Sequence, residues 1–167
     1  MSDEQSTPKE DIVIIRTIPA PVELVWRAWT DPEYVVRWWG PQYFTAPLAE
    51  VDLREGGRFL FAMQAPEDQG GQRHYNAGEY LKVEPHTLLE FTMQLADADG
   101  NPVDPASVGM PPDFPGLIRT RIEFKALRPD LTRMTITEYD WTPGQMMVYS
   151  YAGMHQSLDK MELDLFA

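Results

Sequence analysis

The sequence predicts an α+β domain with a mainly antiparallel β-sheet and a long C-terminal helix. Three observations support this fold class. Seven segments have strand patterns, two short helical segments follow the first of them, and a long helical segment ends the chain. Three helical segments are too few to serve as crossovers between seven parallel strands, so the sheet must be mainly antiparallel.

The first strand is expected over residues 11–18, DIVIIRTI, because β-branched side chains dominate this segment. The next segment has the period of an amphipathic helix, with an apolar face formed by Val22, Val25, Trp26 and Trp29. A second short helix follows, which Asp31 can cap, Pro32 can begin and Gly40 ends. We expect a tryptophan cluster to join these helices to the sheet, namely Trp26, Trp29, Trp38 and Trp39.

Alternating side chains and turn residues predict six further strands, over residues 44–54, 58–64, 73–84, 88–95, 118–125 and 131–141. Residues 96–116 form a long segment rich in Pro, Gly and Asp. A loop of this length inside a compact domain is often a lid or a binding loop, so we expect it to lie over the mouth of a cavity.

The last segment is a helix that Thr142 can cap and Pro143 can begin. Apolar side chains recur along it in steps of three or four, at Met147, Tyr151, Met154, Leu158, Met161 and Leu165. We expect this stripe to be the most buried helical surface in the domain.

Length and composition are typical of a globular protein, with 167 residues of which 43% are hydrophobic and 24% charged. We expect a disordered tail over residues 1–10 and a single domain over residues 11–167. The chain has no cysteine, which excludes disulfides and thiolate chemistry. A formal net charge of −12 disfavours nucleic acid and anionic membranes as partners.

The N-terminus is polar and acidic and lacks the pattern of a signal peptide. No apolar run approaches the ~20 residues that a membrane span needs. The sequence therefore predicts a cytoplasmic protein without a membrane span.

Four segments carry a resemblance to a known family: APVELVWRAWTDPEYVVRWWGP (20–41), VDLREGGRFLFAM (51–63), GEYLKVEPHTLLEFT (78–92) and GMHQSLDKM (153–161). Together they resemble the family named after the activator of heat-shock-protein-90 ATPase, within the START-like or SRPBCC superfamily. The resemblance covers residues 12 to about 163. It implies a helix-grip fold, with a seven-stranded sheet around the C-terminal helix and two small helices after strand one. It also implies a deep cavity, which in relatives binds lipids, polyketides, plant hormones or drugs.

The sequence departs from the family pattern at Met154, where a tryptophan is usual, and this change should reshape the cavity wall. We expect the cavity to be lined by inward-facing sheet residues and by one face of the last helix. The sheet residues are Phe59, Phe61, Met63, Leu89, Phe91, Met93, Ile122 and Phe124, and the helix residues are Met147, Tyr151, Met154 and Leu158.

Glu138 is the one candidate for a catalytic residue. In a regular strand it shares the inward face with Met134 and Ile136, which would desolvate its carboxylate and raise its pKa. A bulge or the end of the strand would instead leave it in water. Arg16 and Arg121 are both candidate partners, and the sequence does not choose between them.

Metal and nucleophile motifs are absent. The three histidines, His74, His86 and His155, have no metal-ligand spacing, and no G-x-S-x-G is present. We expect no metal and no cofactor.

Three functions remain open at this point. The first is the non-catalytic binding of a hydrophobic small molecule in the cavity. The second is a cyclase or hydrolase that uses the same cavity and needs Glu138. The third is a protein-interaction module of the co-chaperone type. The last would need an exposed apolar patch larger than a monomer usually has. In the eukaryotic co-chaperone that gives the resembled family its name, a separate domain engages the chaperone, and we expect no such domain here.

Overall fold

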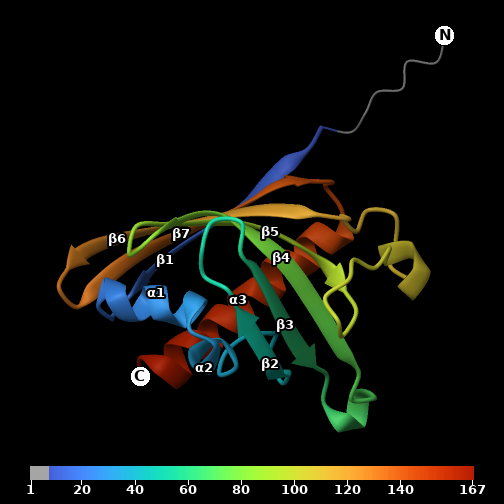
Figure 1. Ribbon diagram of the computed structural model, residues 1–167, viewed down its shortest axis with the longest axis horizontal. Coiled ribbons are helices and arrows are strands. Elements are labelled where there is room, and N and C mark those ends of the chain that lie inside the picture. Colours follow the sequence, from blue (N-terminus) through green and yellow to red (C-terminus); the bar gives the residue numbers. More distant parts are fainter. Residues whose placement is uncertain (1–7) are drawn as a thin grey trace.

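The computed structural model describes residues 8–167, and its elements follow the predicted order (Figure 1). The predicted tail therefore falls largely on residues 1–7, outside the described residues, and the first strand begins at Glu10. The helices are α1 (Val22–Thr30), α2 (Pro32–Val35) and α3 (Gln145–Leu165). The strands are β1 (Glu10–Ile18), β2 (Thr45–Val51), β3 (Arg58–Gln64), β4 (Arg73–Glu84), β5 (Leu88–Ala96), β6 (Ile118–Arg128) and β7 (Leu131–Trp141).

The seven strands form one sheet in the order β1-β7-β6-β5-β4-β3-β2, and every neighbouring pair is antiparallel. The α+β prediction is therefore confirmed. The N-terminal strand pairs with the last strand, while β2 to β7 follow one another as a meander. The sheet curves over α3, which crosses its concave side (Figure 1).

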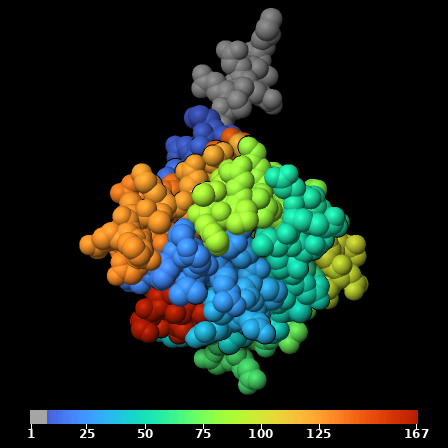
Figure 2. Space-filling view, turned by 60° about the vertical axis from the view of Figure 1, so that its left-hand side comes forward, coloured from blue at the N-terminus to red at the C-terminus, as the bar shows by residue number. Residues whose placement is uncertain are grey.

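Helices α1 and α2 close one end of the concave side. In the space-filling view, α1 and α2 fill the centre of the face shown, between the β6–β7 turn and the segment around the β2–β3 turn (Figure 2). Aromatic edge-to-face pairs join them to the sheet, with ring centroids 5.4 Å apart for Trp26 and Phe124 and 5.0 Å apart for Trp39 and Phe61. The predicted tryptophan clamp is thus confirmed, and it makes this half of the domain a solid core.

Helix α3 differs from the prediction in its start and in its burial. It begins at Gln145, two residues after Pro143, with Gly144 as the N-cap. Only Ser157, Leu158 and Met161 are buried among its 21 residues, whereas α1 buries five of nine. The expectation that the α3 stripe is the most buried helical surface is wrong, because the first half of α3 lies over a cavity and has no fully buried residue.

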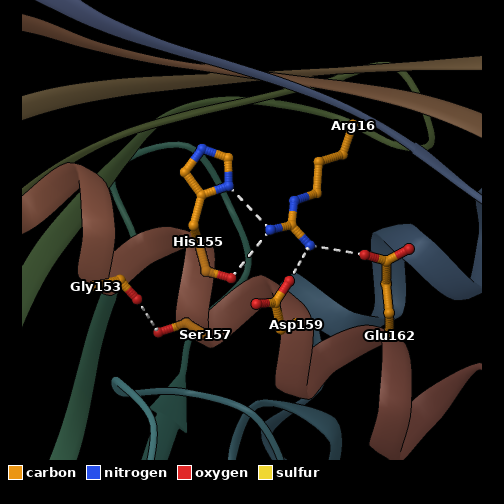
Figure 3. A network of polar contacts seen from close by, with 6 residues as sticks. All are labelled: Arg16, Gly153, His155, Ser157, Asp159 and Glu162. Atoms are coloured by element: carbon orange, nitrogen blue, oxygen red, sulfur yellow. Dashed lines mark hydrogen bonds and ion pairs between the residues drawn. The ribbon is translucent and has the colours of Figure 1, made fainter.

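The middle of α3 is held to β1 by Arg16, whose guanidinium points from the sheet at the helix (Figure 3). Nη1 of Arg16 lies 2.8 Å from the carboxylate of Asp159 and 2.7 Å from that of Glu162. Nη2 donates to Nδ1 of His155 at 2.9 Å and to its carbonyl oxygen at 3.1 Å. One arginine therefore fixes the helix at three successive turns.

Within residues 8–167, no helix combines the length and the apolar character that crossing a membrane requires.

Candidate functional site

A cavity of about 350 Å³ lies between the sheet and the first half of α3. The strands contribute Met63, Met93 and Ile118 to its lining, and α3 contributes Met146, Gly153 and Met154. Two connecting segments complete the wall. Trp39, Gly40, Pro41 and Phe44 come from the α2–β2 segment, and Met110, Phe114 and Pro115 come from the long β5–β6 segment. The lining is mainly apolar and rich in methionine, a side chain that adapts to irregular shapes.

Few ionisable side chains face this space. The lining includes Glu138, His74 and the phenol of Tyr149, together with the neutral amides of Asn76 and Gln94. No lysine or arginine lies among the described residues that line the cavity. A charged ligand would therefore meet one carboxyl group and no fixed cation.

Glu138 lies on the inner face of β7, where 3% of its surface is exposed. Immediately after it the strand contains a bulge, because Ile12 pairs with Glu138 while Glu10 pairs with Trp141. Asp11 thus opposes both Tyr139 and Asp140. Asp140 adopts a positive φ of 62°, which aspartate tolerates better than most residues, and its backbone N–H donates to the Asp11 carboxylate at 3.0 Å.

The bulge turns Trp141 to the same side of the sheet as Glu138. In a regular strand the two side chains would point to opposite faces, because they are three residues apart. Here Trp141 is buried, and its Nε1–H donates to Oε2 of Glu138 at 3.1 Å. Among residues 8–167 this is the only hydrogen bond that the Glu138 carboxyl group accepts.

Burial raises the pKa of Glu138 to about 7, and the hydrogen bond from Trp141 opposes part of this rise. Neither arginine considered from the sequence is its partner. Arg16 contacts α3, and Arg121 lies by Glu90 and Glu123. Thr120 pairs directly with Glu138 across the β6–β7 ladder, but its buried hydroxyl oxygen has no hydrogen-bond partner. Glu138 is therefore a nearly isolated carboxyl group that reaches an apolar cavity.

The β5–β6 segment is attached to the start of α3. Oδ2 of Asp113 accepts a long hydrogen bond of 3.4 Å from the backbone N–H of Met146. A side chain at Gly144 would bring its Cβ within 2.8 Å of that oxygen, so glycine permits the close approach. The carboxylate also lies where the helix dipole favours negative charge. The β5–β6 segment, predicted as a lid, thus contributes Met110, Phe114 and Pro115 to the cavity wall. It contacts α3 through the carboxylate of Asp113.

The thirteen residues expected to line the cavity divide into three groups. Met63, Met93, Glu138 and Met154 lie in the lining. Seven others are packed in the solid core instead, because the aromatic side chains of α1 and the following segment fill the space in front of them; these are Phe59, Phe61, Leu89, Phe91, Ile122, Phe124 and Leu158.

The remaining two lie on α3 away from the lining. Met147 packs half-buried against the core. Tyr151 is 46% exposed, and its ring stands edge-on to His155 at 4.6 Å between centroids. Both were expected to face the cavity together with Met154 and Leu158. The fully buried residues of α3 all lie in its C-terminal half, so side chains of its first half are left partly exposed to water.

Sequence reasoning missed Trp141 and the residues of the α2–β2 segment. Regular alternation places Trp141 on the outer face, and the signal that could have corrected this is Asp140, a residue type common at positive φ. The histidines lie in three separate places: His74 at the cavity, His86 by Trp26, and His155 by Arg16. In the part of the chain that the structure describes, no three His, Asp or Glu side chains are grouped as metal ligands.

Comparisons with known proteins agree with this architecture. The profile of the family described as Activator of Hsp90 ATPase homolog 1-like protein matches residues 19–163. A crystal structure of a protein from Nitrosomonas europaea superposes with a TM-score of 0.70 at 28% identity, covering 92% of each chain. A solution structure from Arthrobacter aurescens gives a TM-score of 0.76 at 26% identity, covering 96% of this chain and 91% of that one.

A third solved structure carries the family name. The AHSA1-like protein from Aeromonas hydrophila gives a TM-score of 0.68 at 26% identity, covering 92% of this chain and 90% of its own. No curated protein matches the chain.

Proposed function

The chain belongs to the activator of Hsp90 ATPase homolog 1-like family, and from this premise we propose that it binds a hydrophobic small molecule in the cavity between the sheet and α3. One observation carries the proposal: a mainly apolar cavity of about 350 Å³ lies where the first half of α3 leaves the sheet. Small-molecule sites have volumes of roughly 300–1,000 Å³ and combine apolar walls with a few polar groups. Filling this space would also cover the α3 side chains that line the cavity and are only partly buried.

A displacement assay tests the proposal. A neutral fluorescent probe that brightens in apolar surroundings would be titrated with the protein and then displaced by bicyclic aromatic compounds. Met154→Trp places a larger side chain in the lining and should weaken binding by about tenfold or more, because overpacking costs typically 1–3 kcal/mol.

The matched control is Val148→Trp. Val148 lies on the same helix but is 63% exposed and outside the lining. This variant should bind the probe as the wild type does. Equal loss of binding in both variants, or no binding by the wild type, would contradict the proposed site.

A second candidate function, catalysis in the same cavity, is favoured by Glu138 alone. A carboxyl group with a pKa near 7 in an apolar site can give or take a proton at neutral pH. If the domain is an enzyme of this kind, Glu138→Gln should lower turnover of a bound compound by roughly two to four orders of magnitude while binding persists. Displacing compounds that are recovered unchanged after long incubation with wild-type protein favour binding without catalysis.

A further inference from the structure

We propose that Glu138 selects, among hydrophobic small molecules, those that carry a nitrogen hydrogen-bond donor, such as an amine, an amidine or an N–H heteroaromatic group, and that it disfavours carboxylates. This inference rests on the proposed function and gives that cavity a ligand class.

The first argument is the unused hydrogen-bonding capacity of the carboxyl group. A carboxylate has about four acceptor positions on its two oxygens. In residues 8–167 the protein fills one of them, through Trp141 on Oε2. Glu138 belongs to the cavity lining, so a ligand there can supply a donor that the fold does not.

The second argument is the absence of a competing cation. The described lining contains no lysine or arginine, and His74 and Tyr149 are its other ionisable side chains. Lys160 is outside the lining, and its ammonium group already donates to the carbonyl oxygens of three lining residues, Gly40, Pro41 and Phe44. A carboxylate ligand would find no counter-charge and would be repelled by Glu138.

The third argument is that the carboxyl group is held in place. The β1–β7 ladder fixes the backbone at Glu138, and the bulge at Asp140 brings Trp141 beside it. A preorganised acceptor loses little conformational entropy when a donor arrives. The isolation that raises the pKa of Glu138 to about 7 would also be relieved by a bound ammonium or amidinium group, which favours the charged carboxylate.

The selectivity should be large because a site built for a hydrogen bond penalises ligands that lack it. An aromatic ligand without a donor would leave the buried Glu138 carboxyl group with no hydrogen bond beyond the one from Trp141. A ligand with a donor would form a hydrogen bond to a charged or polarised oxygen in an apolar site. We expect a preference of about tenfold to a hundredfold for the donor-bearing ligand over its apolar analogue.

The test uses three bicyclic compounds of similar shape as competitors of the neutral probe: quinolin-2-amine, 2-methylnaphthalene and naphthalene-2-carboxylate. At a pH of about 8 the wild type should bind quinolin-2-amine about tenfold or more tightly than 2-methylnaphthalene, and the carboxylate most weakly. In Glu138→Gln the advantage of the amine and the penalty of the carboxylate should both shrink, while 2-methylnaphthalene binds as before.

Glu90→Gln is the matched control. Glu90 is the other buried glutamate of the sheet, with 5% exposure, but it pairs with Arg119 and lies outside the cavity lining. This variant should keep the wild-type order of the three compounds, so that a change in order reports the cavity and not a general loss of buried charge.

The outcomes distinguish the selectivity inference from the proposed binding function on which it rests. If 2-methylnaphthalene displaces the probe but quinolin-2-amine binds no more tightly, or if the amine keeps its advantage in Glu138→Gln, the selectivity inference is overturned and the binding function stands. If the wild type binds neither the probe nor any competitor, both are overturned. Even if Glu138→Gln fails to fold, the comparison of the three compounds on the wild type still tests whether the cavity prefers a ligand with a donor.

Discussion

The side-chain nitrogen of Lys160 on α3 lies 3.0 Å from the carbonyl oxygen of Gly40 in the α2–β2 segment. The same nitrogen donates to Phe44 at 3.0 Å and to Pro41 at 3.3 Å. Gly40, Pro41 and Phe44 all line the cavity. One half-buried ammonium group therefore joins a wall of the cavity to the helix above it, and its partial burial lowers the pKa of Lys160.

Replacing this lysine should loosen the wall. Lys160→Met keeps the apolar stem but removes the ammonium group, leaving three carbonyl oxygens without that donor. We expect the free energy of unfolding to fall by about 1–3 kcal/mol, measured by urea denaturation. The control Lys125→Met changes an exposed lysine of β6 and should stay within about 0.5 kcal/mol of the wild type. Equal effects of the two variants would contradict the role given to Lys160.

The attachment of α3 to the core gives a second prediction. Leu158 is fully buried, so Leu158→Ala should lower the free energy of unfolding by about 2–5 kcal/mol through lost contacts and a new void. Leu163 lies on the same helix and is 70% exposed, and Leu163→Ala should change stability by less than about 0.5 kcal/mol. Thermal or chemical denaturation of both variants measures the difference. Similar losses would show that α3 does not anchor the domain through Leu158.

The strands were predictable because their signals are local. Alternation in β6 and β7 and the turn residues between strands reflect which face of each strand is buried, and a period of two is visible in the sequence itself. The inward direction of Glu138 follows from the parity of Met134 and Ile136, and the structure places all three on the same buried face. Antiparallel pairing then follows from the shortage of crossover helices.

The position of the cavity was not predictable in the same way. It depends on how far Trp26 and Trp39 fill the concave side, which is decided by contacts with Phe124 and Phe61 that are distant in sequence. The partner of Glu138 was hidden for a similar reason. The bulge that turns Trp141 inward is stabilised by Asp11, which lies 129 residues before Asp140, so the local pattern of β7 still reads as a regular strand.

The β5–β6 segment gives a third prediction. Met110, Phe114 and Pro115 of residues 97–117 line the cavity, and Asp113 joins the segment to α3. Amide hydrogen exchange should be faster there than in β5, and Asp113→Ala should increase it further at residues 110–115 and at the first turn of α3. Asp99→Ala, in the same segment but outside the cavity lining, should not change exchange at those positions. Protection of 97–117 equal to that of β5 would contradict a lid.

The last prediction is a dependence of stability on pH that belongs to Glu138. Its pKa in the folded protein is about 7 against an ordinary value of 4.5, so between these values the folded state binds more protons than the unfolded state. The contribution of Glu138 to stability is therefore fully present below pH 4.5 and is lost as the pH rises through 7. Since one pKa unit corresponds to about 1.4 kcal/mol, the loss should be about 3 kcal/mol.

Urea denaturation of the wild type and of Glu138→Gln across this range measures the effect. Glutamine keeps the size of the side chain and cannot ionise, so the contributions of all other titratable groups, which are present in both proteins, cancel in the difference. The difference in unfolding free energy should favour the wild type more at low pH and should shift toward the variant between pH 4.5 and 7. A constant difference would mean that the Glu138 carboxyl group is hydrated in solution, and the selection of donor-bearing ligands would then lose its physical basis.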